Sequence, residues 1–375
     1  MVAFLLFIFL LFFLLNRIGS VISSKFKYIV IGVISLYWGF ALINAPDIEG
    51  YMYCYNIIGT NGNPYSSLSG FTFHQFEPGF IYYMSFVKKC VDSYYFFQFI
   101  SFVIELGLTY YGINKLLNEE STTLKIMLAF ALNFTLFMSA MRQGIAIALF
   151  ICSLPFALER QYLKTLGFIC VGFLFHRSII IAFLFILLYW IIINKRENFY
   201  FNKWITISLF LLCNIIYFSG YSLSNGLSFI SQLFIDEIDL AGDRNYSTYA
   251  ETLSGKTNYG ILKVIELDFC YIVIFFNKKF RNKTEFNLLY LLFLVYFVLN
   301  LSIGGMLIHR TNYFLVIPYY VVLFLSLDYF FHNKLNLTRI ASKNIILGYI
   351  VGLFFIQKII SSDYIFEYHL FDFII

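Results

Sequence analysis

Two short polar interruptions of the apolar sequence hold the residues best suited to chemistry: Met141-Arg142-Gln143 and His176-Arg177-Ser178. Each splits a long apolar run that has lysine or arginine near both of its ends. Since short cytoplasmic loops retain Lys and Arg, this pattern predicts helical hairpins whose tips face the opposite side of the membrane. An arginine at membrane depth costs about 3 kcal/mol on insertion scales. Arginines at these tips therefore favour a role in binding anionic, lipid-borne substrates.

Arg142 and His176 each have a specific chemical role open to them. Arg142 precedes an apolar helix, so its guanidinium and the free backbone N–H groups of that helix could hold an anion together. The alternative is an arginine that reaches out to the lipid headgroups. His176 lies beside Arg177, and a neighbouring cation favours the neutral imidazole that a general base requires. A structural histidine, bonded at a helix end, is the alternative interpretation.

Acidic and further basic residues fall on the same predicted outer side. Asp47 and Glu49 could hold a divalent cation, although chance occurrence in a long loop is the better explanation of the pair, and Asp47 alone could act as a base. Glu77, before Pro78, is expected at the N-cap or in the first turn of a short helix. The other chemically suggestive residues expected on this side are Gln143, Asp243, Arg244, His309 and Arg310.

Composition predicts an all-α, polytopic integral membrane protein. Hydrophobic residues make up 60% of the 375 residues and charged residues only 13%, which no water-soluble domain of this size would need. Residues 1–15 lack a basic leading segment and a cleavage site, so we expect a retained helix there. The net charge of +5 is explained by cytoplasmic anchoring residues and indicates no nucleic-acid partner.

About twelve spans are expected, since a helix needs about 20 residues to cross roughly 30 Å of hydrocarbon. They lie near residues 2–15, 28–44, 94–112, 123–140, 142–158, 163–175, 177–193, 204–219, 259–276, 285–303, 311–330 and 344–361. The apolar segment near 77–88 is too short to cross and is expected to be a re-entrant or interfacial helix. The run 163–193 is short for two spans, but a single crossing would place the basic run 278–283 outside, against the positive-inside rule.

The same rule places two longer loops, about 44–93 and 220–258, on the extracytoplasmic side. Tyrosines in the first of them, such as Tyr51, could contact sugars or form a membrane-interface belt. Charged residues within spans normally face a protein interior or a wet cavity, as we expect for Glu105. Lys263 and Glu266, three positions apart, are expected to neutralise each other.

A series of short motifs runs through the chain in a characteristic order. It consists of Pro46-Asp47 with Tyr51 and Tyr55, Glu77-Pro78-Gly79-Phe80, Met141-Arg142-Gln143-Gly144-Ile145-Ala146, Phe175-His176-Arg177-Ser178 and a late Arg310. From about residue 40 to 320 this series resembles the EpsG-type, Wzy-like polysaccharide polymerases. The chain departs from their pattern at 42–45, where an arginine and a Gly-Thr pair are common, and at Arg177, where a small or apolar residue is more usual.

The resemblance implies a membrane glycosyltransferase. Such polymerases act at the outer face of the bacterial cytoplasmic membrane, on repeat units carried by undecaprenyl pyrophosphate, and transfer a growing glycan to the terminal sugar of another unit. Arg142 and Arg310 would then bind the pyrophosphate, and His176 or Asp47 would accept the proton of the acceptor hydroxyl. Further candidates for substrate contacts are Gln143, Arg177, Glu77 and Tyr51, which belong to the motif series, and Arg244, which is expected on the same outer side.

No metal or cofactor is expected, and the expected partners are the lipid-linked donor and acceptor, the bilayer, a flippase and a chain-length regulator. Three other functions share parts of this chemistry. A flippase for lipid-linked sugars would show two related halves, which the sequence lacks. An oligosaccharide ligase would differ only in its acceptor. A metal-dependent transferase using polyprenyl-phosphate sugars would depend on Asp47 and Glu49.

Overall fold

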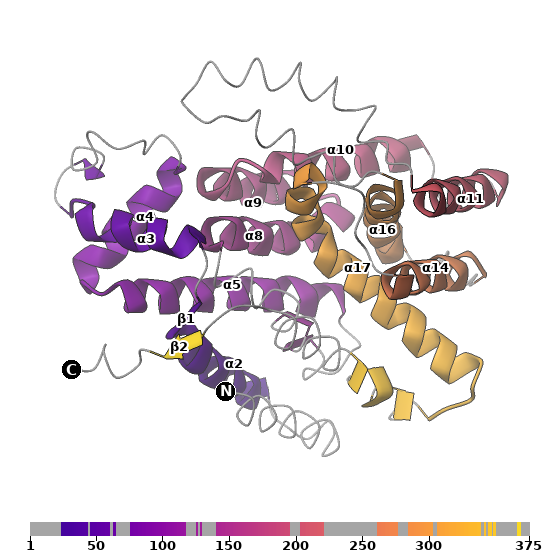
Figure 1. Cartoon of the computed structure of the whole chain (residues 1–375), viewed down its shortest axis with the longest axis horizontal. Coiled ribbons are helices and arrows are strands. Elements are labelled where there is room, and N and C mark those ends of the chain that lie inside the picture. Colours follow the sequence, from indigo (N-terminus) through magenta and orange to yellow (C-terminus); the bar gives the residue numbers. More distant parts are fainter. Residues whose placement is uncertain are drawn as a thin grey trace. The chain divides into compact units, whose positions relative to one another are not determined.

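The structure is a computed structural model of the chain. It describes residues 24–43, 46–60, 63–64, 76–117, 125–126, 128–129, 140–195, 203–220, 261–276, 284–302, 306–338, 341–342, 344–346, 348–349 and 366–368. The chain divides into two compact units. The first comprises Met1–Ile180 and Asn336–Ile375, and the second comprises Ile181–Leu335. Figure 1 labels the helices and strands of both.

The first unit is built mainly from helices, as the apolar composition predicts. They are α2 (Ser24–Gly39), α3 (Pro46–Ile57), α4 (Pro78–Cys90), α5 (Tyr94–Leu116), α8 (Met141–Leu158), α9 (Tyr162–Phe175) and the beginning of α10 (Ile179–Lys195). Helices α5, α8 and α9 lie side by side, with α3 and α4 at one end of them (Figure 1). That end holds the first turn of α8 and the last turn of α9, and hence both polar interruptions.

Helices α5 and α8 approach each other closely because glycines lie at their contact. A Cβ atom on Gly112 of α5 would lie 2.6 Å from the carbonyl oxygen of Ile151 in α8. A Cβ atom on Gly144 of α8 would lie 2.7 Å from a carboxyl oxygen of Glu105 in α5. Close backbone approach through small residues is the usual packing of membrane helices. Glu105 is fully buried here, which confirms that it faces the protein interior.

The polar interruption at 176–178 breaks the chain into two helices. His176 has extended backbone angles, so α9 ends at Phe175, and α10 begins at Ile179. The side chain of Ile179 lies back against α9, in the place that a Cβ atom on Gly172 would occupy. Residues seven apart in a continuous helix are about 10 Å apart along the axis. The helix therefore ends at this interruption and a second one begins after it, as predicted, while the crossing of the membrane by both helices stays a prediction.

Helix α3 lies inside the segment predicted as the first extracytoplasmic loop. Pro46 is its first residue, and Asp47 and Glu49 stand in its first turn. Proline is well tolerated at the first helical position, and acids there complement the helix dipole. The local sequence therefore explains a helix that the analysis of hydrophobic spans did not include.

A small sheet departs from the all-α prediction. The end of the span expected near 28–44 forms strand β1 (Ala41–Ile43), which pairs antiparallel with β2 (Phe366–Tyr368). Ala41 lies opposite Tyr368 in this register. Three residues are too short a run to show the alternation that identifies a strand, so the prediction missed it.

Three described helices are long and apolar enough to cross a membrane: Tyr94–Leu116, Met141–Leu158 and Thr311–Asn333. Shorter apolar helices cover Tyr162–Phe175, Ile179–Ile192, Trp204–Ser219 and Asn287–Ser302. The spans expected near 2–15, 123–140 and 344–361 lie wholly or largely outside the described residues, so the number twelve stays a prediction. Helix α4 has 13 residues, too few to cross, which confirms a short helix near 77–88.

The second unit contains most of α10 together with α11 (Lys203–Ser219), α14 (Ile261–Phe276), α16 (Thr284–Ser302) and α17 (Met306–Asn333). Asn300 of α16 and Asn312 of α17 exchange two side-chain hydrogen bonds, of 3.2 and 3.0 Å. Lys263 and Glu266 of α14 form an ion pair of 2.6 Å, which confirms the predicted neutralisation. Tyr319 of α17 donates a hydrogen bond to Glu266.

Candidate anion-binding site

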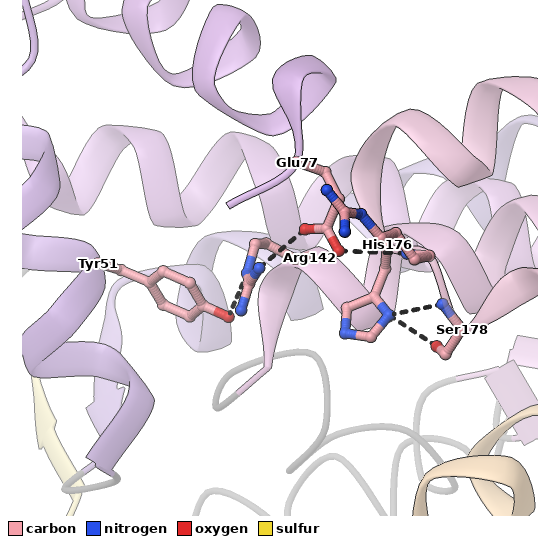
Figure 2. A network of polar contacts seen from close by, with 6 residues as sticks. Tyr51, Glu77, Arg142, His176 and Ser178 are labelled. Atoms are coloured by element: carbon pink, nitrogen blue, oxygen red, sulfur yellow. Dashed lines mark hydrogen bonds and ion pairs between the residues drawn. The ribbon is translucent and has the colours of Figure 1, made fainter. Parts of the chain in front are cut away.

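Four segments of the first unit meet at one end of α8. Helix α3 supplies Tyr51, the residue before α4 supplies Glu77, the first turn of α8 supplies Arg142, and the turn between α9 and α10 supplies residues 176–178 (Figure 2). We refer to these residues together as the arginine site. The site joins segments that are distant in the sequence but belong to one compact unit.

Arg142 is the second residue of α8, and its guanidinium binds the carboxylate of Glu77. Arg142 Nη1 lies 2.8 Å from Glu77 Oε2. The two side chains are 17% and 8% exposed, so the pair is largely shielded from solvent without being sealed off. An unpaired charge is costly to bury, so each member of the pair lowers the free-energy cost of burying the other.

An aromatic wall lies beside Arg142. The guanidinium carbon is 4.3 Å from the ring centroid of Phe76 and 5.9 Å from that of Tyr51, which are cation–π distances. Arg142 Nε also donates a long hydrogen bond of 3.5 Å to the Tyr51 hydroxyl. Burial raises the pKa of the Tyr51 phenol, while the charge of Arg142 partly lowers it. The phenol therefore stays protonated at neutral pH.

Glu77 occupies the N-cap position of α4, as predicted, but its side chain makes no capping bond to that helix. Oε2 instead binds Arg142, and Oε1 accepts a 3.2 Å hydrogen bond from the backbone N–H of Arg177. The carboxylate therefore connects the start of α4, the start of α8 and the α9–α10 turn. In this arrangement one guanidinium and one backbone N–H hold an anion between them.

The side chain of His176 organises the α9–α10 turn. Its Nδ1 atom accepts a 3.2 Å hydrogen bond from the Ser178 N–H and lies 2.6 Å from the Ser178 hydroxyl oxygen (Figure 2). Because a backbone N–H can only donate, Nδ1 carries the lone pair, and the ring proton lies on Nε2. The imidazole is neutral in this arrangement, and Nε2–H is a hydrogen-bond donor.

Gly79 allows α4 to approach the end of α9. A Cβ atom at this position would lie 2.7 Å from both the Cβ atom and the carbonyl oxygen of Leu174. We expect Gly79→Ala to force the two helices apart, at a cost of about 1–3 kcal/mol for overpacking, and to draw Glu77 away from Arg177. Gly167→Ala in α9, where nothing lies within 4 Å, is the matched control. The level of the protein in the membrane should fall for Gly79→Ala and not for Gly167→Ala; equal levels of the two variants would contradict this account.

Comparison with known protein families matches residues 24–370 to the EpsG family. The chain belongs to the EpsG family. The match spans nearly the whole chain and includes every residue of the arginine site, so the resemblance inferred from motif order is confirmed. Comparisons with curated proteins and with solved structures find no match. Family membership and the apolar helices together indicate a membrane protein of polysaccharide biosynthesis.

The other predicted site residues of this EpsG-family chain lie in different surroundings. Gln143 is buried beside Arg142 in the first turn of α8, whereas Asp47 is exposed in the first turn of α3. The Arg177 side chain is exposed, and its backbone, rather than its guanidinium, contacts Glu77. Arg310 belongs to the second unit, in the first two turns of α17. Arg244 and nearly all of the predicted loop 220–258 lie outside the described residues.

Two residues, one beside the arginine site and one within it, were not predicted to act there. Phe76 stacks on the guanidinium, but an aromatic residue before an acid has no distinguishing pattern in so aromatic a chain. Ser178 bonds to His176, and here a signal exists, because serine two positions from a polar side chain often forms a local turn. The EpsG-family resemblance included Ser178 in its motif without giving it a role.

Within the described part of the chain, no group of three or more His, Cys, Asp or Glu side chains could hold a metal ion. Asp47 and Glu49, considered as a cation-binding pair, are both exposed on α3. The cation that the arginine site presents is the guanidinium of Arg142. The planar guanidinium suits an anion, such as a carboxylate or a phosphate, whose negative charge is shared by two or more oxygens.

Proposed function

We propose that this EpsG-family protein polymerises oligosaccharide repeat units carried on undecaprenyl pyrophosphate, at the outer face of the bacterial cytoplasmic membrane. The observation that carries the proposal is the arginine site, where the guanidinium of Arg142 and the N–H of Arg177 already hold a carboxylate. A pyrophosphate presents oxygens of the same kind and more charge. Arginine is well suited to phosphate because its planar fork can bind two oxygens at once.

The proposed reaction is a displacement at the anomeric carbon of the donor glycan. The acceptor hydroxyl oxygen bonds to that carbon, and the bond to the pyrophosphate oxygen breaks, so that undecaprenyl pyrophosphate leaves with the electron pair. Arg142 stabilises the charge that develops on this leaving group, an effect worth about 3 kcal/mol per donor in other enzymes. Arg310 is the second proposed pyrophosphate ligand.

The hydroxyl proton needs an acceptor, and the first unit offers three candidates: His176, Asp47 and Glu77. The aromatic residues around Arg142 are proposed to contact the sugars or the lipid next to the pyrophosphate. Gln143, Arg177 and Arg244 are proposed as further substrate contacts. The proposed partners are a flippase that supplies the lipid-linked units, a chain-length regulator and the surrounding bilayer.

Deletion of the gene tests this function. We expect gel analysis of the surface glycan to show a ladder of chain lengths in the parent strain and a single repeat unit in the deletion strain, with the ladder restored by a plasmid copy. Loss of every surface form, including the single unit, would indicate a flippase. Full-length chains that remain attached to the lipid carrier would indicate a ligase. An unchanged ladder would reject the proposal.

A further inference from the structure

The two ends of the Glu77 carboxylate are held in different ways. Oε1 is bound by a backbone N–H of the α9–α10 turn, which is part of the fold. Oε2 is bound by the guanidinium of Arg142, which sits at the end of a flexible side chain. The contact through Oε2 is therefore the one that can change without moving the backbone.

Arg142 is also the group proposed to bind the donor's pyrophosphate, so the carboxylate and the pyrophosphate compete for one guanidinium. The pyrophosphate diester carries two negative charges and several oxygens that an arginine fork can bind. When the donor occupies the site, Arg142 turns toward it, and Glu77 Oε2 loses its cation. Oε1 stays bound to the Arg177 N–H, so the carboxylate keeps its place beside the reacting groups.

We propose that Glu77 is the catalytic base of the transfer, and that donor binding activates it by drawing Arg142 onto the pyrophosphate. This inference rests on the proposed function. In the free protein Oε2 is bound by Arg142 and is therefore not available to an acceptor hydroxyl. Beside a bound anion, without its cation, a carboxylate is driven to accept a proton, because like charges in a shielded site repel. The base thus becomes active when the donor is present.

The proton balance of this step is simple. The acceptor hydroxyl loses its proton to Glu77 Oε2 as its oxygen bonds to the anomeric carbon, and the carbon–oxygen bond to the pyrophosphate breaks. Glu77 is then a neutral carboxylic acid. It returns the proton to water as undecaprenyl pyrophosphate departs, and the carboxylate again pairs with Arg142.

The other two candidates are less well placed for this task. The lone pair of His176 lies on Nδ1 and is engaged by Ser178, so the ring offers a donor at Nε2. Asp47 is exposed in the first turn of α3, and no hydrogen bond between it and the arginine site is found among the described residues. Glu77, in contrast, forms an ion pair with Arg142, the residue proposed to bind the pyrophosphate.

Glu77→Gln tests the inference, because an amide has nearly the same shape and still accepts hydrogen bonds but takes no proton. General bases contribute roughly 10²–10⁴-fold to rate, so we expect the polymer ladder to collapse to the single unit at a normal protein level. The purified full-length variant should bind undecaprenyl pyrophosphate at least as tightly as the wild type, since the competing charge is gone. Glu77→Asp, which keeps the carboxylate, should retain part of the ladder.

Asp92→Asn is the matched control, because Asp92 is an exposed acid just beyond the far end of α4; it should keep both the ladder and the binding. A wild-type ladder in Glu77→Gln would overturn the inference, as would loss of undecaprenyl pyrophosphate binding, which would reduce Glu77 to a positioning residue for Arg142. If the Glu77→Gln protein does not accumulate in the membrane, two other variants test the inference. Glu77→Asp keeps a carboxylate and His176→Gln leaves Glu77 in place, so both must still form polymer, and loss of polymer in either would overturn the inference. Failure of the wild-type protein to bind undecaprenyl pyrophosphate would reject the proposed function itself.

Discussion

Replacing Arg142 with alanine is expected to abolish long-chain polymer while single repeat units are still made and exported. Arg142 supplies the only described guanidinium that holds an anion in the arginine site. Removing one preorganised donor to a developing charge costs about 10²–10³-fold in rate, which suffices to stop a reaction that must repeat many times per chain. The measurement is the length distribution of surface glycan on gels, with protein level in the membrane recorded beside it.

The Arg142→Ala variant also leaves Glu77 without its cation, which could lower the stability of the protein. Three further variants therefore separate an effect on catalysis from an effect on stability. Arg142→Ala combined with Glu77→Gln removes the orphaned charge and should restore protein level without restoring polymer. Arg142→Lys keeps a cation for Glu77 but loses the planar fork and the stacking on Phe76, and should form short chains at most. Arg160→Ala, an exposed position at the opposite end of α8, should leave the ladder unchanged. Normal chain length in Arg142→Ala would refute the assignment.

Asparagine and glutamine at position 176 should have unequal effects. Asparagine can place an acceptor near the position of Nδ1 and keep the bond from Ser178, but it has nothing at the position of Nε2. Glutamine can place an N–H donor near Nε2. If His176 donates to the pyrophosphate or the acceptor, loss of that bond costs about 1.5–3 kcal/mol, or roughly 10- to 100-fold in rate.

We therefore expect His176→Gln to keep part of the ladder, and His176→Asn to lose most of it while the protein still accumulates in the membrane. His176→Ala, which removes both functions, should leave only single repeat units. Complete loss of polymer in both His176→Gln and His176→Asn, at normal protein level, would instead identify His176 as the base. Unchanged chains in all three variants would reduce it to a structural residue.

Much of the arginine site could be predicted because its members are costly in an apolar chain. An arginine or a histidine that interrupts a hydrophobic run is conspicuous, and the break between α9 and α10 coincides with the interruption at His176. The contribution of Glu77 was harder to see. An acid before Pro78 has an adequate local explanation as an N-cap, and only the packing of α4 on α9 through Gly79 shows that its carboxylate points elsewhere.

The features that could not be predicted from the sequence are contacts between segments that are distant in the chain. The contact of Arg142 with Phe76 and Glu77 depends on how the residues before α4 meet the first turn of α8, and hydrophobic periodicity carries no information on such contacts. The β1–β2 pair was not predicted for a related reason, because each strand has only three residues and its partner lies far away in the sequence. Arg310, equally conspicuous in sequence, belongs to the second unit, and its proposed role depends on the family resemblance.

The β1–β2 pairing also bears on how the protein is made. The residues of the arginine site lie between Tyr51 and Ser178 in the sequence, so the ribosome has delivered all of them before most of the second unit is synthesised. Strand β2 emerges only after the second unit, and it must then return to β1 near the beginning of the chain. Nascent domains generally fold in the order in which they appear. The arginine site can thus form early during biogenesis, whereas the first unit acquires its final strand last.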